Sequence, residues 1–373
     1  MKRGDLKNIL VPIDFSEMSE QSIETAQRLA QRFDASIHLV HIHENWYPIG
    51  LMAPGAPVSL PMLTFRQDDA DRIRKRLQLL SKKHGIPMTN CYMRSDVSVF
   101  SGVCTVARQI AADLIVMQTH SSTGMTRFFE GSHAERIVQH SPCPVLVARS
   151  RRQKAGRIRS RAPALEGINE ILVPVDFSPS SFQALEYAIK FAQSAAARLI
   201  VFHAVHLDYA FSADGYTKCD LPLLINEARE NAAIQMLEFI RRAKFREVQF
   251  EIVIKIAPPA SEICVFADDR DVDLIIAATH GRTGLKHFLL GSIAEQVVRR
   301  AHQPVLVVPS LPERSKARLA RVTRPVQQPM SQPPKHRTLF RSSDRLTKNI
   351  PSLLEHPFPE RRKTNKFRES HVR

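Results

Sequence analysis

Ala278-Thr-His-Gly-Arg-Thr-Gly-Leu-Lys-His-Phe-Leu-Leu-Gly-Ser292 is the stretch of the chain that decides the fold. An apolar run, residues 273–277, precedes it and an amphipathic run, residues 293–301, follows it, so the pattern is strand, glycine-containing loop and helix. Glycine lets a backbone approach a ligand closely, and the N–H groups at a helix start, with Ser292 as the expected capping hydroxyl, favour a phosphate. The loop predicts a phosphate site, although it is neither a Walker A loop nor the dinucleotide fingerprint. The alternative is that its glycines only make two tight turns.

A second copy of the pattern favours the phosphate interpretation. Residues 119–124, 131–132, 134–135 and 144–147 match residues 279–284, 291–292, 294–295 and 304–307 at a constant offset of 160. Such self-similarity predicts a tandem duplication. With 373 residues and 43% hydrophobic content, the chain can bury two full cores at about 100–200 residues per domain.

Strands and helices alternate in both halves. Asn8–Ile13 and Ser36–Ile42 are apolar on both faces, as central parallel strands are, and Ser16 is a natural N-cap for the helix between them. The second half repeats the order from Glu170–Val175 onward. Five such strands in each half predict parallel strands joined by right-handed crossovers, hence two α/β domains with helices on both faces of a sheet.

The charge is concentrated outside the expected domains. We expect a first domain over 1–149, a basic linker over 150–167, a second domain over 168–310 and a largely disordered, proline-rich tail over 311–373. Of the net charge of +16, residues 149–161 carry +7 and residues 311–373 carry +11, which leaves about −2 for the folded domains. The linker and tail are either solvated segments or electrostatic contacts with nucleic acid or an anionic lipid surface.

Location and cysteine chemistry follow from composition. No apolar run reaches the ~18 residues that span a bilayer, and the N-terminal residues lead straight into the first strand, so we expect no transmembrane segment and a cytoplasmic location. The five cysteines form no C-x-x-C pair, which predicts reduced, mostly buried thiols. His41 and His43 share one face of a strand, but the sequence indicates no third ligand for a metal.

Three features of each half converge on one edge of the predicted sheet. They are the aspartate after the first strand (Asp14, Asp176), the end of the second strand (Ile42, Ala204) and the loop after the fourth strand. Ligands of such sheets bind beyond the C-terminal strand ends. A carboxylate there suits hydroxyl or amino donors, and a backbone edge suits a base, so the pattern predicts a mononucleotide site. Each aspartate alone is equally consistent with a helix-start residue.

The motifs resemble those of the universal stress protein family. They are Ile-Leu-Val-Pro-Val-Asp-Phe-Ser at 171–178, the loop at 278–292 and Gln-Pro-Val-Leu-Val-Val at 303–308, with their counterparts in the first half. The likeness covers residues 5–149 and 168–309, as in a tandem two-domain member. It implies Rossmann-like (adenine nucleotide alpha hydrolase-like) domains and a role in stress response. It also implies a homodimer or intramolecular pseudo-dimer, paired through the edge strands that end in Pro-Val-Leu-Val.

One branch of this family binds ATP through the pattern Gly-x-x-Gly-x9-Gly-Ser/Thr. In the second half the pattern falls on Ala278, Gly281, Gly291 and Ser292, so one glycine is replaced. In the first half it falls on Gln118, Ser121, Gly131 and Ser132, so two glycines are lost. The resemblance therefore implies ATP, with Mg²⁺ as its companion, in the second domain, and a degenerate copy in the first.

The resemblance also suggests which residues face which part of the nucleotide. Asp176 and the Ala204 backbone would face adenine and ribose, and the glycines and Ser292 would face phosphates. The candidate site residues are Asp176, Ala204, Ala278, His280, Gly281, Gly291 and Ser292, and, less favoured, Asp14, Ile42, Gln118, Ser121, Gly131 and Ser132. We interpret His280 as a residue that orders the loop and not as a base.

The sequence offers no dedicated catalytic base, and the nucleophile elbow and adenylating motifs of related folds do not occur in it. We therefore expect a non-enzymatic, cytoplasmic stress-response protein in which ATP in the second domain stabilises a conformation that partners read. The alternative is a nucleotide-independent scaffold whose basic tail attaches to nucleic acid or a membrane. A weak ATPase is the least favoured interpretation.

Overall fold

The computed structural model describes most of the chain up to Ser310. The described residues are 6–44, 67–119, 133–149, 151–152, 158–159, 167–207, 221–245, 247–279, 281 and 291–310. They lie within one compact unit, which spans residues 1–313. Below, residues 6–149 are called the first module and residues 167–310 the second module.

The first module alternates strands and helices, as the sequence predicts. Its elements are β1 (Asn8–Pro12), α1 (Glu17–Phe33), β2 (Ser36–Glu44), α2 (Gln67–His84), the 3₁₀ turn Met88–Asn90, β3 (Cys91–Asp96), α3 (Val99–Gln109), β4 (Leu114–Thr119), α4 (His133–His140) and β5 (Val145–Arg149). The hydroxyl of Ser16 accepts the Ser19 backbone N–H at the start of α1, and Asp34 ends the helix in the left-handed conformation (φ 62°). The predicted N-cap is confirmed.

The second module repeats this order. Its elements are β8 (Glu170–Pro174), α5 (Pro179–Ala195), β9 (Arg198–Val205), α6 (Leu221–Arg241), β10 (Phe250–Ile256), α7 (Pro259–Asp269), β11 (Leu274–Ala278), α8 (Ser292–Arg300) and β12 (Val305–Val308). The start of α5 copies that of α1, because the Ser178 hydroxyl accepts the Ser181 N–H and Pro179 occupies the first turn.

Between the modules lies a short antiparallel ribbon of β6 (Arg151–Arg152) and β7 (Ile158–Arg159). Nothing in the basic composition of this segment predicts a ribbon, since strands are recognised by apolar patterning. Residues 45–66, residues 208–220 and the predicted tail at 311–373 lie outside the described residues.

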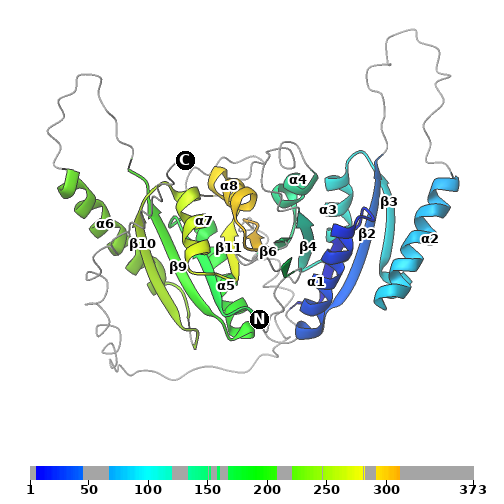
Figure 1. Ribbon diagram of the computed structural model, residues 1–373, viewed down its shortest axis with the longest axis horizontal. Helices are drawn as coiled ribbons and strands as arrows, with labels where there is room; N and C mark the ends of the chain where they lie inside the picture. Colours follow the sequence, from blue (N-terminus) through cyan, green and yellow to red (C-terminus); the bar gives the residue numbers. More distant parts are fainter. Residues whose placement is uncertain are drawn as a thin grey trace, which may run out of the picture. The chain divides into compact units, whose positions relative to one another are not determined.

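A ten-stranded sheet runs through both modules in the order β10-β9-β8-β11-β12-β5-β4-β1-β2-β3 (Figure 1). The strands within each module are parallel. The modules meet where β12 pairs antiparallel with β5, with Leu306 opposite Leu146. The resemblance implied pairing through these Pro-Val-Leu-Val strands, and the structure forms that pairing within a single chain.

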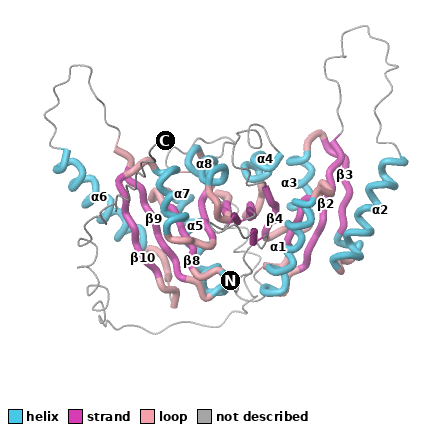
Figure 2. The backbone as a smooth tube through the Cα atoms, viewed as in Figure 1, coloured by secondary structure: helices cyan, strands magenta, loops and turns pink. Residues whose placement is uncertain are grey.

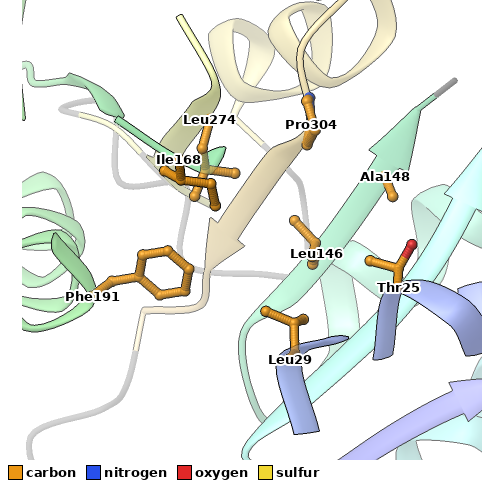
Figure 3. Close-up of a pocket in the computed structure, with 8 residues that line it drawn as sticks. All are labelled: Thr25, Leu29, Leu146, Ala148, Ile168, Phe191, Leu274 and Pro304. Carbon is orange, nitrogen blue, oxygen red and sulfur yellow. The ribbon is translucent and has the colours of Figure 1, made fainter. Parts of the chain in front are cut away.

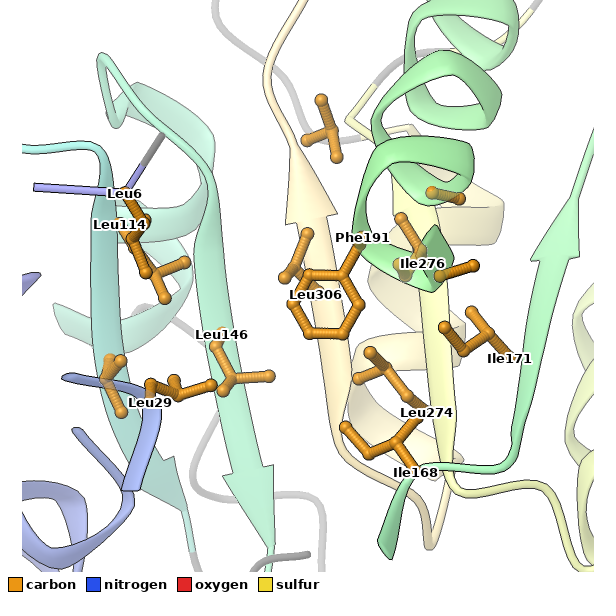
Figure 4. Packing of buried hydrophobic residues seen from close by; sticks show 14 of the residues in the cluster. Leu6, Leu29, Leu114, Leu146, Ile168, Ile171, Phe191, Leu274, Ile276 and Leu306 are labelled. Atoms are coloured by element: carbon orange, nitrogen blue, oxygen red, sulfur yellow. The ribbon is translucent and has the colours of Figure 1, made fainter. Parts of the chain in front are cut away.

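Helices cover both faces of the sheet and bury two apolar layers (Figure 2). One layer packs α1, α2, α5 and α6 and includes Leu29, Leu80, Phe191, Met236 and Leu306. The other packs α3, α4, α7 and α8 and includes Val103, Ile137, Ile263, Val297 and Val305. Figure 4 shows Leu29 and Leu146 of the first module facing Phe191 and Leu306 of the second. Because alternate strand residues point to opposite faces, the strands must be apolar throughout.

A small apolar crevice lies where the modules meet (Figure 3). It is lined by Thr25, Leu29, Leu146, Ala148, Ile168, Phe191, Leu274 and Pro304. The Thr25 hydroxyl donates to the Gln21 carbonyl within α1, so the lining presents apolar surface. Ligand sites combine such surface with a few converging polar groups. We therefore interpret the crevice as a gap in the packing of the junction.

The described cysteines are free thiols. Cys104 and Cys143 are buried, and burial raises the pKa of Cys104 to about 11 and that of Cys143 to about 12. Cys91 and Cys264 are half-buried, and Cys219 lies outside the described residues. The expectation of buried thiols is confirmed for two of the cysteines and is too strong for two others.

The junction strand gives a test of the fold. Leu306 is fully buried in β12, opposite Leu146, so Leu306→Asp places a charge in the apolar layer that joins the modules. We expect the free energy of unfolding to fall by more than about 3 kcal/mol, measured by urea denaturation.

Val265→Asp is the matched control, because Val265 is 51% exposed on α7. The control should stay within about 0.5 kcal/mol of the parent protein. Equal unfolding midpoints for the two variants would show that β12 is not part of a packed junction.

Candidate functional site

The C-terminal ends of β8, β9 and β11 bring the predicted residues of the second module to one edge of the sheet, which is called the site edge below. Asp176 follows β8, Ala204 lies near the end of β9, and Ala278 ends β11. Ala204 is in register with Lys255 of β10, and Ala278 with Val308 of β12. All three candidate residues are half-buried. Parallel strands therefore produce the common edge at which the sequence predicts a ligand.

Asp176 and Gly281 are in direct contact across this edge. A Cβ atom placed on Gly281 would lie only 2.6 Å from Asp176 Oδ2, so the carboxylate occupies the space that any other residue would need. Asp176 Oδ1 accepts the backbone N–H of Ser178 at 3.0 Å. The structure thus joins the aspartate after the first strand to the loop after the fourth, and it gives Gly281 a packing reason to be glycine.

Thr279 anchors the base of the loop. Its carbonyl accepts the Gly291 N–H at 2.7 Å, and its own N–H donates to the Val308 carbonyl at 3.1 Å. The Thr279 hydroxyl accepts the Ser310 backbone N–H at 3.2 Å, and the Ser310 hydroxyl bonds to the Ser180 hydroxyl at 2.8 Å. Sequence reasoning missed the roles of Thr279 and Ser310. Isolated hydroxyl residues carry no periodic signal, and only the constant offset between the two halves marks Thr279.

The start of α8 differs from the prediction. Its N-cap is Gly291, with φ −59° and ψ 139°, and Ser292 is the first helical residue. The expectation that Ser292 supplies the capping hydroxyl is therefore wrong, because the extended N-cap backbone falls one residue earlier. Glycine has no side-chain acceptor, so the first N–H groups of α8 are left to water, the neighbouring loop or a ligand. His280 and residues 282–290 lie outside the described residues.

Asp14 occupies the position of Asp176 in the first module and, like Asp176, accepts the backbone N–H of the serine two residues later. Its Oδ1 accepts both the backbone N–H of Ser16 at 2.9 Å and the Ser16 hydroxyl at 2.6 Å. Burial acts to raise the pKa of Asp14, but hydrogen bonds from Ser16 and Ser19 outweigh it, and the pKa lies below its ordinary value. The carboxylate is therefore engaged in the start of α1.

Ile42 and Gln118 of the first module both contact helices. Ile42 is 8% exposed, and a Cβ atom on Gly102 of α3 would lie 2.6 Å from its Cδ1 atom. Gln118 Nε2 donates to Gln21 Oε1 of α1 at 2.6 Å. The long amide thus points towards α1 at the position where the second module has Ala278. Ser121, Gly131 and Ser132 lie outside the described residues.

The histidine pair of β2 does not stand out as a metal site. His41 Nδ1 lies 2.7 Å from the Ile13 carbonyl oxygen, which gives this ring a protein partner. Within the part of the chain that the structure describes, no group of three or more His, Cys, Asp or Glu side chains could hold a metal ion.

A family model described as the universal stress protein family matches residues 5–149 and 167–309. The chain belongs to the universal stress protein family. It is similar to universal stress protein MJ0531 of Methanocaldococcus jannaschii, with 33% identity over 141 residues, 37% of this chain and 81% of that protein. A universal stress protein of Mycolicibacterium smegmatis is 24% identical over 310 residues, 80% of this chain and 96% of that protein.

The fold agrees with solved universal stress proteins. The crystal structure of one from Archaeoglobus fulgidus covers 82% of this chain and 97% of its own, with a TM-score of 0.51 and 18% identity. This likeness shows the fold alone. None of the helices that the structure describes combines the length and the hydropathy needed to span a bilayer.

Gly281→Ala tests the contact at the site edge of this universal stress protein. The new methyl group would meet Asp176 Oδ2 at 2.6 Å, so the carboxylate or the loop must move. We expect a loss of about 1–3 kcal/mol in the free energy of unfolding, measured by denaturant titration.

Gly167→Ala is its control, because no atom lies within 4 Å of a Cβ placed there. This variant should change the free energy of unfolding by less than about 0.5 kcal/mol. If Gly281→Ala changed the free energy of unfolding as little as Gly167→Ala, the Asp176–Gly281 contact would not constrain the loop.

The hydrogen bonds on Asp14 give a pH test. The stabilisation that this carboxylate contributes is fully present above the ordinary carboxyl pKa of about 4 and is lost as the pH falls through its lowered pKa. Ser16→Ala removes the hydroxyl donor, so the pKa of Asp14 should rise, as followed by NMR titration of its carboxyl carbon.

Ser22→Ala is the control for this titration, since the Ser22 hydroxyl donates to the Met18 carbonyl elsewhere on α1. The pKa of Asp14 should match the parent value in that variant. An unchanged pKa in Ser16→Ala would mean that the hydroxyl does not hold the charged form.

Proposed function

We propose that this universal stress protein is a cytoplasmic stress-response protein that binds ATP at the site edge of its second module. The observation that carries the proposal is the contact of Asp176 with Gly281. It joins a carboxylate suited to hydroxyl or amino donors with the loop that the family pattern assigns to phosphates. ATP would then connect the end of β8 to the start of α8 and stabilise one conformation for partners to read.

Each part of the edge has a chemical role in this proposal. Asp176 and the Ala204 backbone would recognise ribose and adenine. Gly281, Gly291 and Ser292 would hold phosphates, helped by the N–H groups and the positive dipole end of α8. Ala278 adds a single methyl group where the family pattern has glycine, and His280 would order the loop. Mg²⁺ prefers phosphate and carboxylate oxygens, so the ATP phosphates would carry it.

The first module enters the proposal as a degenerate copy. Its Gln118 side chain bonds to Gln21 of α1, and Ser16 engages the Asp14 carboxylate twice. The position that Gln118 holds in the first module is held by Ala278 in the second, which has no amide to make such a bond. The domain boundaries at 149, 168 and 310, and the interpretation of the two domains as a pseudo-dimer, belong to the same proposal. We assign no catalytic role to the chain.

A thermal-shift experiment tests ATP binding. A ligand that binds only the native state stabilises it by ~2.7 kcal/mol at a hundredfold excess over the dissociation constant. We expect millimolar ATP with Mg²⁺ to raise the melting temperature of the full chain. Gly291→Trp should abolish the shift, because the indole would fill the start of α8, whereas a chain ending at Ser310 should keep it.

Gly131→Trp is the matched control, since Gly131 holds the corresponding pattern position in the first half. This variant should respond to ATP as the parent protein does. A shift lost in Gly131→Trp and kept in Gly291→Trp would move the site to the first module. Failure of ATP to shift any of the proteins would favour the nucleotide-independent scaffold with a basic tail.

A further inference from the structure

A histidine in the second strand of each module bonds to the peptide that precedes the site aspartate. His203 Nδ1 of β9 lies 2.7 Å from the Val175 carbonyl oxygen, and His41 Nδ1 of β2 lies 2.7 Å from the Ile13 carbonyl oxygen. His203 is 9% exposed. The two modules differ at many of the candidate site positions, but both have this bond at the same length. We therefore treat it as a feature of the fold and not as an accident of one module.

The carbonyl partner fixes the tautomer of both rings. A carbonyl oxygen only accepts, so Nδ1 must carry the proton and donate. Burial lowers the pKa of His41, and the charges of His43 and Arg76 act in the same direction, against the Ile13 carbonyl and Asp14. The His41 ring is therefore neutral at physiological pH, and its donor does not depend on an added proton.

The residue after each aspartate is a phenylalanine with a left-handed backbone. The φ angle is 66° at Phe177 and 64° at Phe15. This conformation costs about 1–2 kcal/mol for a residue with a side chain, so surrounding packing must hold it. The imidazole provides that packing, with ring centroids 4.3 Å apart for Phe177 and His203 and 4.8 Å apart for Phe15 and His41.

Each histidine thus holds the residues on both sides of an aspartate. We call His203 with Val175 and Phe177, and His41 with Ile13 and Phe15, the histidine clamps. The N–H of Val175 also donates to the Phe202 carbonyl at 2.8 Å, so both polar groups of that residue are engaged. The aspartate between two clamped neighbours has little freedom in the direction of its Cα–Cβ bond.

The clamp of the second module acts from the helix layer. His203 and Ala204 are neighbours on β9, so their side chains point to opposite faces of the sheet. Phe177 also packs against Phe239 of α6, with ring centroids 5.6 Å apart, in the layer formed by α5 and α6. The His203 side chain therefore contacts the Asp176 turn from the face of the sheet that α5 and α6 cover.

We propose that His203 is a positioning residue for the nucleotide site, because it fixes the turn that presents the Asp176 carboxylate to Gly281 and to the ligand. This inference rests on the proposed function of the second module. His41 makes the same clamp, but the carboxylate that it positions, Asp14, is bound twice by Ser16. The first half also lacks two glycines of the phosphate pattern, so we expect a change at His41 to affect the start of α1 and not nucleotide binding.

The test compares His203→Leu with His41→Leu in the full chain. Both variants lose one hydrogen bond to a carbonyl and keep an apolar side chain, so both melting temperatures should fall by similar amounts. Isothermal titration with Mg²⁺-ATP should show a dissociation constant raised about tenfold in His203→Leu and unchanged in His41→Leu. His203→Asn should recover most of the affinity, because its Nδ2 can replace Nδ1 as the donor.

The outcomes separate this inference from the proposed function. Parent-like ATP affinity in His203→Leu, despite a lower melting temperature, would overturn the positioning role and leave ATP binding intact. Equal losses of affinity in the two leucine variants would also overturn it, because the effect would then be one of general stability. A parent protein that does not bind ATP overturns both proposals. If His203→Leu does not fold, His203→Asn and His203→Gln make the same comparison, since only asparagine places its donor at the Nδ1 position.

Discussion

The antiparallel pairing of β12 with β5 is the constraint on which the rest of the structure depends. Each module ends in a largely apolar, valine-rich strand, and such a strand left as a sheet edge invites association with other chains. Pairing Leu306 with Leu146 buries both edges against each other and extends two sheets into one. The two modules then form one unit that shares an apolar layer.

Within this frame the two modules have diverged in what their strand ends do. In the second module the Asp176 carboxylate packs on a glycine of the loop. Both aspartates accept the N–H of the serine that caps the next helix, and in the first module the Ser16 hydroxyl also donates to Asp14 and Gln118 bonds to Gln21 of α1. Among the described residues, the same backbone carries a contact with the loop glycine in the second module and side-chain bonds to α1 in the first. A duplicated fold allows the two edges to differ, because the first module still supplies β5, whose pairing with β12 stabilises both modules.

The sequence is sufficient to predict the fold but only part of the site. Apolar runs, the cap at Ser16 and the constant offset between the halves predicted the alternating strands and helices of both modules, because these signals are local and repeated. The prediction that Ser292 is the N-cap of α8 was wrong by one residue, because the position of an N-cap depends on how the preceding loop enters the helix. The direction of the Gln118 amide and the bonds of Thr279 to Ser310 could not be predicted, because they join residues far apart in the chain.

The histidine clamps show how a side chain of one strand can constrain the turn that follows its neighbour. A left-handed phenylalanine is unfavourable by itself, and an aspartate beside it would be poorly oriented if the strain were released. The imidazole removes both problems at once, since it packs on the phenylalanine ring and bonds the preceding carbonyl. Because the first module keeps the clamp after its loop has lost two pattern glycines, the clamp must stabilise the turn in its own right. A nucleotide site in the second module would then use a turn that the fold already maintains.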